Sequence, residues 1–280
     1  MEYLLNPEQN RYTIYPIQNK DIWAFYKKQQ ALFWTVEEID FSHDYDDFSM
    51  LNENDQNFIK MILAFLSSSD TIVHINLGNR FLKEVQIREA TVAYTFQMMM
   101  ESIHAEVYSL QIDAIIKNEN EKKQMLNAIY EFPCILEKSA WAFKWIDSNE
   151  NFGHRLMAFV IVEGVFLSGS FCSIFWLKKR NIMDGLCSSN DLIFRDKRMH
   201  IDFAILLYSM LANKLSEKDV HMMFLEAVDI EHRFIENLQC LGIDKHHMVE
   251  YIQTVADRLI IKLGYTKFYY SKNPFDFIKI

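Results

Sequence analysis

The segment from Leu156 to Leu177 places the strongest constraint on the fold, because its 22 residues include a single charged side chain, Glu163. Such a segment either spans a membrane or lies inside a large soluble bundle, surrounded by other helices. The Ser168-Gly169-Ser170 cluster suits close helix packing in a bundle, and no other segment is comparably apolar. We therefore predict a buried core helix and no association with a membrane.

Composition favours an all-α fold. Only seven glycines and four prolines leave few turn signals, while long stretches rich in Leu, Met, Ala, Glu, Lys and Phe favour helices. Half of the residues are apolar, which is enough for a large core, and no Ser/Gly/Pro-rich linker divides the chain. We predict one domain over residues 1–280 with an irregular arm at 1–20. The expected helices cover residues 21–34, 52–76, 85–116, 121–131, 134–147, 152–177, 187–213, 217–240 and 244–263.

Charge and cysteine content exclude other classes of protein. A formal net charge of −9 argues against nucleic-acid binding, which needs a basic surface. The cysteines, which show no C-x-x-C spacing, are Cys134, Cys172, Cys187 and Cys240. The N-terminus lacks the charged and then apolar pattern of a signal peptide. We therefore predict a reduced, cytoplasmic setting in which Cys172 and Cys187 are packing residues.

Two predicted helices have related pairs of polar residues. Glu101 and His104 are three residues apart, so they lie on one helix face and can reach the same metal ion. Lys197 and His200 have the same spacing, with lysine where a carboxylate would be expected. The second pair can therefore provide one metal ligand, His200, where the first pair can provide two.

Two further carboxylates, Asp70 and Glu163, lie in apolar surroundings, where a charge is costly unless it is paired or metal-bound. Single carboxylates from two helices with Glu-x-x-His from two others are typical of ferritin-like di-iron and di-manganese proteins. The alternatives are that Asp70 is a polar helix-interior residue and that Glu163 pairs with Arg155 or a lysine. Asp229 and His232 also have this spacing, but in a polar stretch typical of a surface. The joint pattern predicts a ferritin-like helical bundle with additional helices.

The chain resembles the radical-generating small subunit of class I ribonucleotide reductase, in its eukaryotic and poxvirus branch. The stretches with this resemblance are DIWAFYKKQQALFWTVEEID at 21–40, MESIHAEVYSL at 100–110, VEGVFLSGSF at 162–171, SIFWLKKR at 173–180, and VADRL with NPFDF near the end. The resemblance implies a di-iron centre, with manganese possible. It also implies a large catalytic subunit as partner, and a homodimer or a heterodimer with another small subunit.

The resemblance assigns roles to individual residues. The family's metal ligands fall on Asp70, Glu101, His104, Glu163 and His200, and its sixth ligand, a bridging glutamate, falls on Lys197. The stable radical falls on Tyr108. The inner electron route toward the large subunit falls on Trp34, Asp196 and His104. The apolar shell that excludes water from the radical falls on Leu167, Phe171 and Ile193.

Lys197 changes what the site can do. With Asp70, Glu101 and Glu163 it gives a net charge of −2 rather than −4, which matches one divalent ion. An ammonium about 4 Å from such an ion opposes it by roughly 8 kcal/mol at an effective dielectric near 20. Three outcomes follow: one metal, no metal with Lys197 salt-bridged to the carboxylates, or two metals with Lys197 turned away.

These outcomes lead to competing functions. We predict a small subunit that supplies a tyrosyl radical for reducing ribonucleotides to deoxyribonucleotides, with an altered metal site. The alternative is a metal-deficient, non-catalytic partner that assembles or stabilises an active small subunit. A metal-storage or oxidase bundle is a weaker candidate, because Trp34 and Asp196 would have no purpose there. The resemblance also implies a mobile tail beyond the NPFDF stretch, whereas this chain stops at Ile280.

Overall fold

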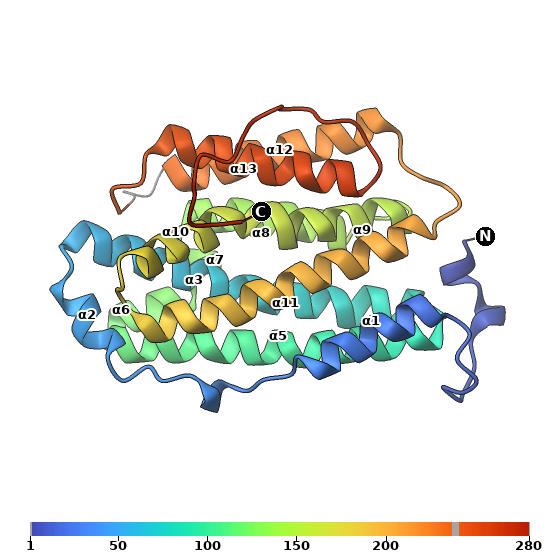
Figure 1. Ribbon diagram of the computed structural model, residues 1–280, viewed down its shortest axis with the longest axis horizontal. Coiled ribbons are helices and arrows are strands. Elements are labelled where there is room, and N and C mark those ends of the chain that lie inside the picture. The colour runs from blue at the N-terminus through green and yellow to red at the C-terminus, as the bar shows by residue number, and fades with distance from the viewer. Residues whose placement is uncertain (1, 237–240, 280) are drawn as a thin grey trace.

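The computed structural model describes residues 2–236 and 241–279, and this part of the chain is an all-α bundle without strands (Figure 1). The fold prediction is therefore confirmed. The helices are α1 (Lys20–Ala31), α2 (Asp44–Met50), α3 (Glu53–Asn76), α4 (Leu82–Glu84), α5 (Arg88–Ile115), α6 (Glu119–Leu126), α7 (Ala128–Glu131), α8 (Pro133–Ile146), α9 (Phe152–Ile161), α10 (Ser168–Lys179), α11 (Asp184–Ser209), α12 (Glu217–Glu236) and α13 (Lys245–Lys262).

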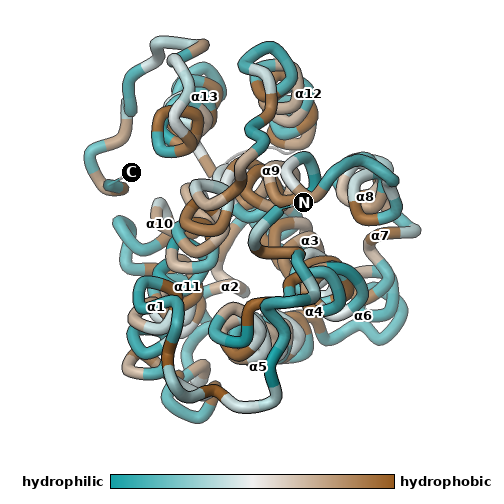
Figure 2. Tube along the Cα trace, turned by 90° about the vertical axis from the view of Figure 1, so that its right-hand side faces the viewer, coloured by the Kyte–Doolittle hydropathy of each residue, from teal (hydrophilic) through white to brown (hydrophobic). Residues whose placement is uncertain are grey.

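The long helices form layers. Helix α5 packs against α3, α1 and α11, and α11 packs against α9 and α10. Figure 2 looks along the bundle and shows α12 and α13 as an outer layer beyond α9 and α10. One hydrophobic core cluster includes buried side chains from all of these helices. This continuous core supports the proposal that residues 1–280 form a single domain.

The apolar segment predicted as a core helix lies inside the bundle. By length and composition alone, helices Phe152–Lys179 and Glu53–Glu84 could both cross a membrane, with mean hydropathies of 1.9 and 1.4 over an 18-residue window of each. The apolar windows of these helices are 89% and 61% buried, which is typical of core helices in a soluble protein. The expectation that no second segment is comparably apolar was wrong.

A π-helical turn, η5 (Val162–Phe166), interrupts the predicted helix 152–177 between α9 and α10. Such turns are often found at functional sites, and this one contains Glu163. Within it, Gly164 lies against Leu259 of α13, so that any side chain at this position would clash. The turn therefore brings Glu163 into the core while α13 covers it closely.

Several helix boundaries differ from the predicted ones because distant residues set them. Helix α2 was not predicted, yet its Asp44 accepts hydrogen bonds from the backbone nitrogens of Gly185 (2.9 Å) and Leu186 (2.7 Å). This cap starts α11 at Asp184, before the predicted 187, and the helix ends at Ser209 instead of 213. No pattern within one helix could have predicted a cap from another.

Other predictions changed near the termini and in the 121–131 region. The predicted helix 121–131 is two helices, α6 and α7, with Asn127 between them. The N-terminal arm includes short 3-10 turns at Tyr3–Leu5 and Pro7–Gln9, and Arg11 pairs with Glu89 at 2.5 Å. The predicted end of helix 217–240 falls on residues 237–240, outside the described residues.

Candidate metal centre

Four elements bring the candidate ligands together in the interior. Helix α3 provides one carboxylate, α5 provides a carboxylate and an imidazole one turn apart, η5 provides a carboxylate and α11 provides an imidazole. Each of these side chains is at most 2% exposed. Their ligand atoms form two groups within 4.8 Å, which are Asp70 with Glu101 and His104, and Glu101 with Glu163 and His200. Glu101 belongs to both groups and is therefore the centre of the cluster.

Lys197 points into the same space. Its Nζ atom lies 2.8 Å from Oδ1 of Asp70, 2.6 Å from Oε2 of Glu101 and 3.0 Å from Oε1 of Glu163. The side chain is 2% exposed, so the ammonium has these carboxylates in place of water. Of the two pairing alternatives for Glu163, the lysine is the one present, because Arg155 pairs with Glu84.

The two imidazoles lie beside the same carboxylates. Nδ1 of His200 is 2.8 Å from Oε1 of Glu101 and 3.6 Å from Oε2 of Glu163. Nδ1 of His104 is 3.5 Å from Oε2 of Glu101. Both ring nitrogens therefore face the carboxylates, the direction from which a metal ion would be bound.

The electrostatics of the cluster favour the ion pairs. Burial would lower the pKa of Lys197, but the three carboxylates outweigh it and hold that pKa well above its usual value. Burial raises the pKa of Asp70 to about 6, although Lys197 opposes the shift. Burial would raise the pKa of Glu101, but the positive charges of Lys197 and His200 hold that pKa well below its usual value. Lys197 is therefore an ammonium at neutral pH.

Trp34, His104 and Asp196 meet next to the cluster, where His104 of α5 lies close to Asp196 of α11. The indole Nε1 of Trp34 donates to Oδ2 of Asp196 at 2.7 Å, and Nε2 of His104 is 3.2 Å from the same oxygen. The Trp34 and His104 rings are stacked with centroids 6.0 Å apart. Burial would lower the pKa of His104, but hydrogen bonds that its ring donates to the carboxylates of Asp196 and Glu101 raise that pKa to about 9. These contacts form a continuous chain from Trp34 to the cluster.

Comparison with known proteins identifies the family. The family model described as "Ribonucleotide reductase, small chain" matches residues 11–274. This chain belongs to the ribonucleotide reductase small chain family. It is 49% identical to the small chain of ribonucleoside-diphosphate reductase from Plasmodium falciparum, over 100% of this chain and 81% of the relative. It is also 49% identical to the small chain of vaccinia virus (strain Ankara), over 100% and 88%.

Solved structures agree with this assignment. The Rnr4 homodimer of Saccharomyces cerevisiae matches 99% of this small chain and 89% of its own chain, with a TM-score of 0.91 and 35% identity. The dimanganese(II)-NrdF of Streptococcus sanguinis matches 94% of each chain with a TM-score of 0.80. Its 15% identity shows the shared fold alone. The ferritin-like architecture of small chains is thus present here.

The cluster of this small chain contains groups that can bind metal ions, but it does not fit a pair of divalent ions. The protonated Lys197 is a donor only and cannot act as a ligand. Its Nζ lies within 3.0 Å of the same carboxylate oxygens that would face the ions. The three carboxylates and the ammonium leave a net charge of −2, half of what two divalent ions need.

Tyr108, the proposed radical residue of this small chain, follows His104 by one helical turn and is fully buried. Its hydroxyl has no hydrogen-bond partner among the described residues. Burial holds its pKa well above the usual value, so the phenol stays protonated. The three residues proposed as its apolar shell are also buried, and they are Leu167, Phe171 and Ile193.

Sequence reasoning separated the surface pair correctly but missed a second buried ion pair. His232 lies on the surface, and Asp229 pairs with Arg233 one turn away. The missed pair is Lys138 of α8 with Glu231 of α12, both at most 1% exposed. Only the apolar neighbours of Glu231 could have indicated its burial, and nothing in the sequence indicates its partner.

Proposed function

We propose that this chain is a ribonucleotide reductase small subunit in which Lys197 takes the place of the metal pair. In this role the chain assembles with other reductase subunits and does not generate the radical itself. The observation that supports the proposal is the set of three ion pairs between Lys197 and the carboxylates of Asp70, Glu101 and Glu163.

The charge of Lys197 opposes metal binding strongly. At an effective dielectric near 20, an ammonium about 4 Å from a divalent ion costs roughly 8 kcal/mol. Tight structural metal sites provide an apparent free energy of about 10 to 16 kcal/mol. A pair of ions would lose most of that gain and would also have to displace three existing ion pairs. Zero or one bound metal per chain is therefore the expected state, with iron or manganese as the ion.

The proposed partners follow from the family. We propose that this chain pairs with a large catalytic subunit and with a second small subunit, which is either another copy or a chain with an intact metal centre. The similarity to the Rnr4 homodimer supports a dimer of small subunits. Such a heterodimer would let a metal-loaded chain supply the radical while this chain stabilises the assembly. The cytoplasmic location remains a prediction.

A second candidate function has its own support. Trp34, Asp196 and His104 keep a continuous chain of contacts at 2.7 and 3.2 Å, and Tyr108 is buried one turn away. A chain that only assembles other subunits has no need for this chain of contacts. In this second candidate, Lys197 turns out of the cluster and the chain supplies a tyrosyl radical.

Metal analysis with electron paramagnetic resonance after Fe(II) loading and aeration separates the candidates. We expect zero to one iron per chain and no tyrosyl signal in the wild type. Lys197→Glu restores the fourth carboxylate and should bind close to two irons. Lys197→Gln, the matched control, removes the ammonium without adding a ligand charge and should stay below two. Two irons and a tyrosyl signal in the wild type would establish the second candidate instead.

A further inference from the structure

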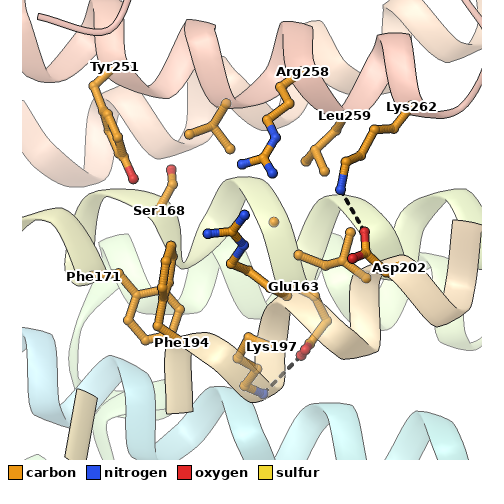
Figure 3. A pocket seen from close by; sticks show the side chains of 14 residues that line it. Glu163, Ser168, Phe171, Phe194, Lys197, Asp202, Tyr251, Arg258, Leu259 and Lys262 are labelled. Carbon is orange, nitrogen blue, oxygen red and sulfur yellow. Dashed lines mark hydrogen bonds and ion pairs between the residues drawn. The ribbon is translucent and has the colours of Figure 1, made fainter. Parts of the chain in front are cut away.

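A cavity of about 50 Å³ lies between α11 and α13, with η5 and α10 at its base (Figure 3). Glu163 and Lys197 lie at its inner end, while Arg258 and Lys262 descend from α13 at its outer side. A buried water needs about 10–15 Å³ in this measure, so the space holds roughly three to five waters. The cavity therefore has room for a small polyatomic ion and not for a nucleotide.

Two guanidinium groups line this cavity, and that of Arg198 lies over the Phe194 ring, at 5.6 Å from its centroid. Neither Arg198 of α11 nor Arg258 of α13 forms an ion pair or hydrogen bond with any residue in the described ranges 2–236 and 241–279. The neighbouring cation, Lys262, is already paired with Asp202 at 2.7 Å (Figure 3). Burial and the positive charge of Arg198 lower the pKa of Arg258, which shows that the two arginines repel each other. The outer end of the cavity thus has uncompensated positive charge.

Tyr251 adds a polar group at another part of the cavity wall. Its side chain is 2% exposed, and its hydroxyl points into the cavity beside Ser168 (Figure 3). The hydroxyl has no hydrogen-bond partner within the described parts of the chain. Burial holds its pKa well above the usual value, so it is a proton donor. Because this hydroxyl opens onto the cavity, an oxygen of a ligand or of water there can accept its hydrogen bond.

We propose that this cavity binds a small free oxyanion, such as phosphate or bicarbonate, between Arg198 and Arg258. Guanidinium groups present planar pairs of N–H donors that match the oxygens of such ions. The remaining wall is mostly apolar and includes Phe171, Phe194 and Leu259. The bound anion would bridge α11 and α13 on the solvent side of Glu163 and Lys197. This inference does not depend on whether the cluster binds metal.

Isothermal titration with phosphate at constant ionic strength tests the proposal, with chloride as the reference anion. We expect saturable binding with one site per chain. Arg258→Gln should weaken it by about tenfold or more, because it removes charged hydrogen bonds. Arg198→Gln, at an exposed position, should act in the same direction and keeps the test valid if Arg258→Gln does not fold. Arg180→Gln, which removes an exposed arginine outside the cavity, is the matched control and should change affinity less than twofold.

The same titration distinguishes the source of the oxyanion. A nucleoside monophosphate is too large for the cavity and should bind at least about tenfold more weakly than phosphate. Equal or tighter binding of the nucleotide would overturn the assignment to a free oxyanion. Absence of saturable phosphate binding, or an equal loss in Arg180→Gln and Arg258→Gln, would overturn the site itself.

Discussion

Two lysines are buried in this bundle, and their surroundings are opposite in kind. Lys138 meets one carboxylate, that of Glu231, and its Nζ donates to the carbonyl of Phe166 at 2.9 Å. It also lies 3.4 Å from the ring centroid of Phe234 and 3.8 Å from that of Phe65. Lys197 meets three carboxylates and no aromatic ring among the described residues.

The pKa values of the two lysines show what these surroundings mean. Burial lowers the pKa of Lys138 to about 8 in spite of Glu231, whereas three carboxylates hold that of Lys197 well above its usual value. The Lys138 pair is neutral overall and joins α8 to α12. The carboxylates around Lys197 exceed the charge of one ammonium. This excess of negative charge distinguishes a ligand site from a structural ion pair.

Removing the ammonium of Lys197 should give a large loss of stability that a metal ion reverses. In chelator, Lys197→Met leaves three buried carboxylates without their shared ammonium and should lower the free energy of unfolding by about 3–5 kcal/mol. Adding Mn(II) at about 1,000 times its dissociation constant should return about 4 kcal/mol. Urea unfolding with and without Mn(II) measures both. If Mn(II) leaves the stability of the variant unchanged, the carboxylates are not a ligand site.

The same change at Lys138 should cost as much but respond to no metal. Lys138→Met leaves Glu231 buried and uncompensated, so the free energy of unfolding should fall by about 3–5 kcal/mol. The double variant Lys138→Met with Glu231→Leu should recover most of this loss, because a packed apolar pair replaces the ions. The same urea series is the assay. If Mn(II) restored the stability of Lys138→Met, the carboxylate beside Lys138 would bind metal as well, and the proposed difference between the two lysines would be wrong.

Alkaline pH should separate the lysines by sign. Lys138 has a pKa of about 8 when folded and 10.5 as its ordinary value, so the unfolded chain binds more protons between these pH values. Its contribution to stability should therefore rise with pH in this range, by at most about 1.4 kcal/mol per pH unit. The raised pKa of Lys197 has the opposite effect. Its contribution to stability is complete below the ordinary pKa of 10.5 and is lost only as the pH rises above that value. Urea unfolding of the wild type and Lys138→Met at pH 8, 9 and 10 should diverge, and parallel curves would contradict the assignment.

Neutralising one carboxylate should have the smallest effect at the three-carboxylate cluster. Glu163→Gln leaves Lys197 with Asp70 and Glu101, so we expect a loss of about 1 kcal/mol in the free energy of unfolding. Glu231→Gln leaves Lys138 without any carboxylate and should cost about 3 kcal/mol. Thermal or urea unfolding of the two variants compares them directly. Equal losses would mean that both lysines depend on a single partner.

The sequence was informative wherever a residue's role depends on its own helix. Apolar neighbours and the i, i+3 spacing of Glu101 and His104 were enough to select the residues that the structure brings together. The burial of Glu163 followed from the apolar segment around it. The all-α fold and the family could be predicted in the same way, because they depend on composition and on local motifs.

Features that depend on contacts between helices could not be read from the sequence. Charge arithmetic left three outcomes open for the metal site, and it could not show that Lys197 packs among α3, α5 and η5 with its Nζ atom beside all three carboxylates. The partner of Lys138 lies on a distant helix, α12, and the N-terminal cap of α11 comes from Asp44. Arg198 and Arg258 line the same cavity because α13 packs over α11, and the sequence does not show this packing.

The most direct test of the central claim locates the lysine and the metal together. Crystals of the wild-type chain soaked anaerobically in Fe(II) should show, in anomalous difference maps at the iron edge, at most one partly occupied peak in the cluster. The Nζ atom of Lys197 should remain in contact with Asp70, Glu101 and Glu163. Two fully occupied iron peaks between these carboxylates, with Lys197 turned away, would contradict the account.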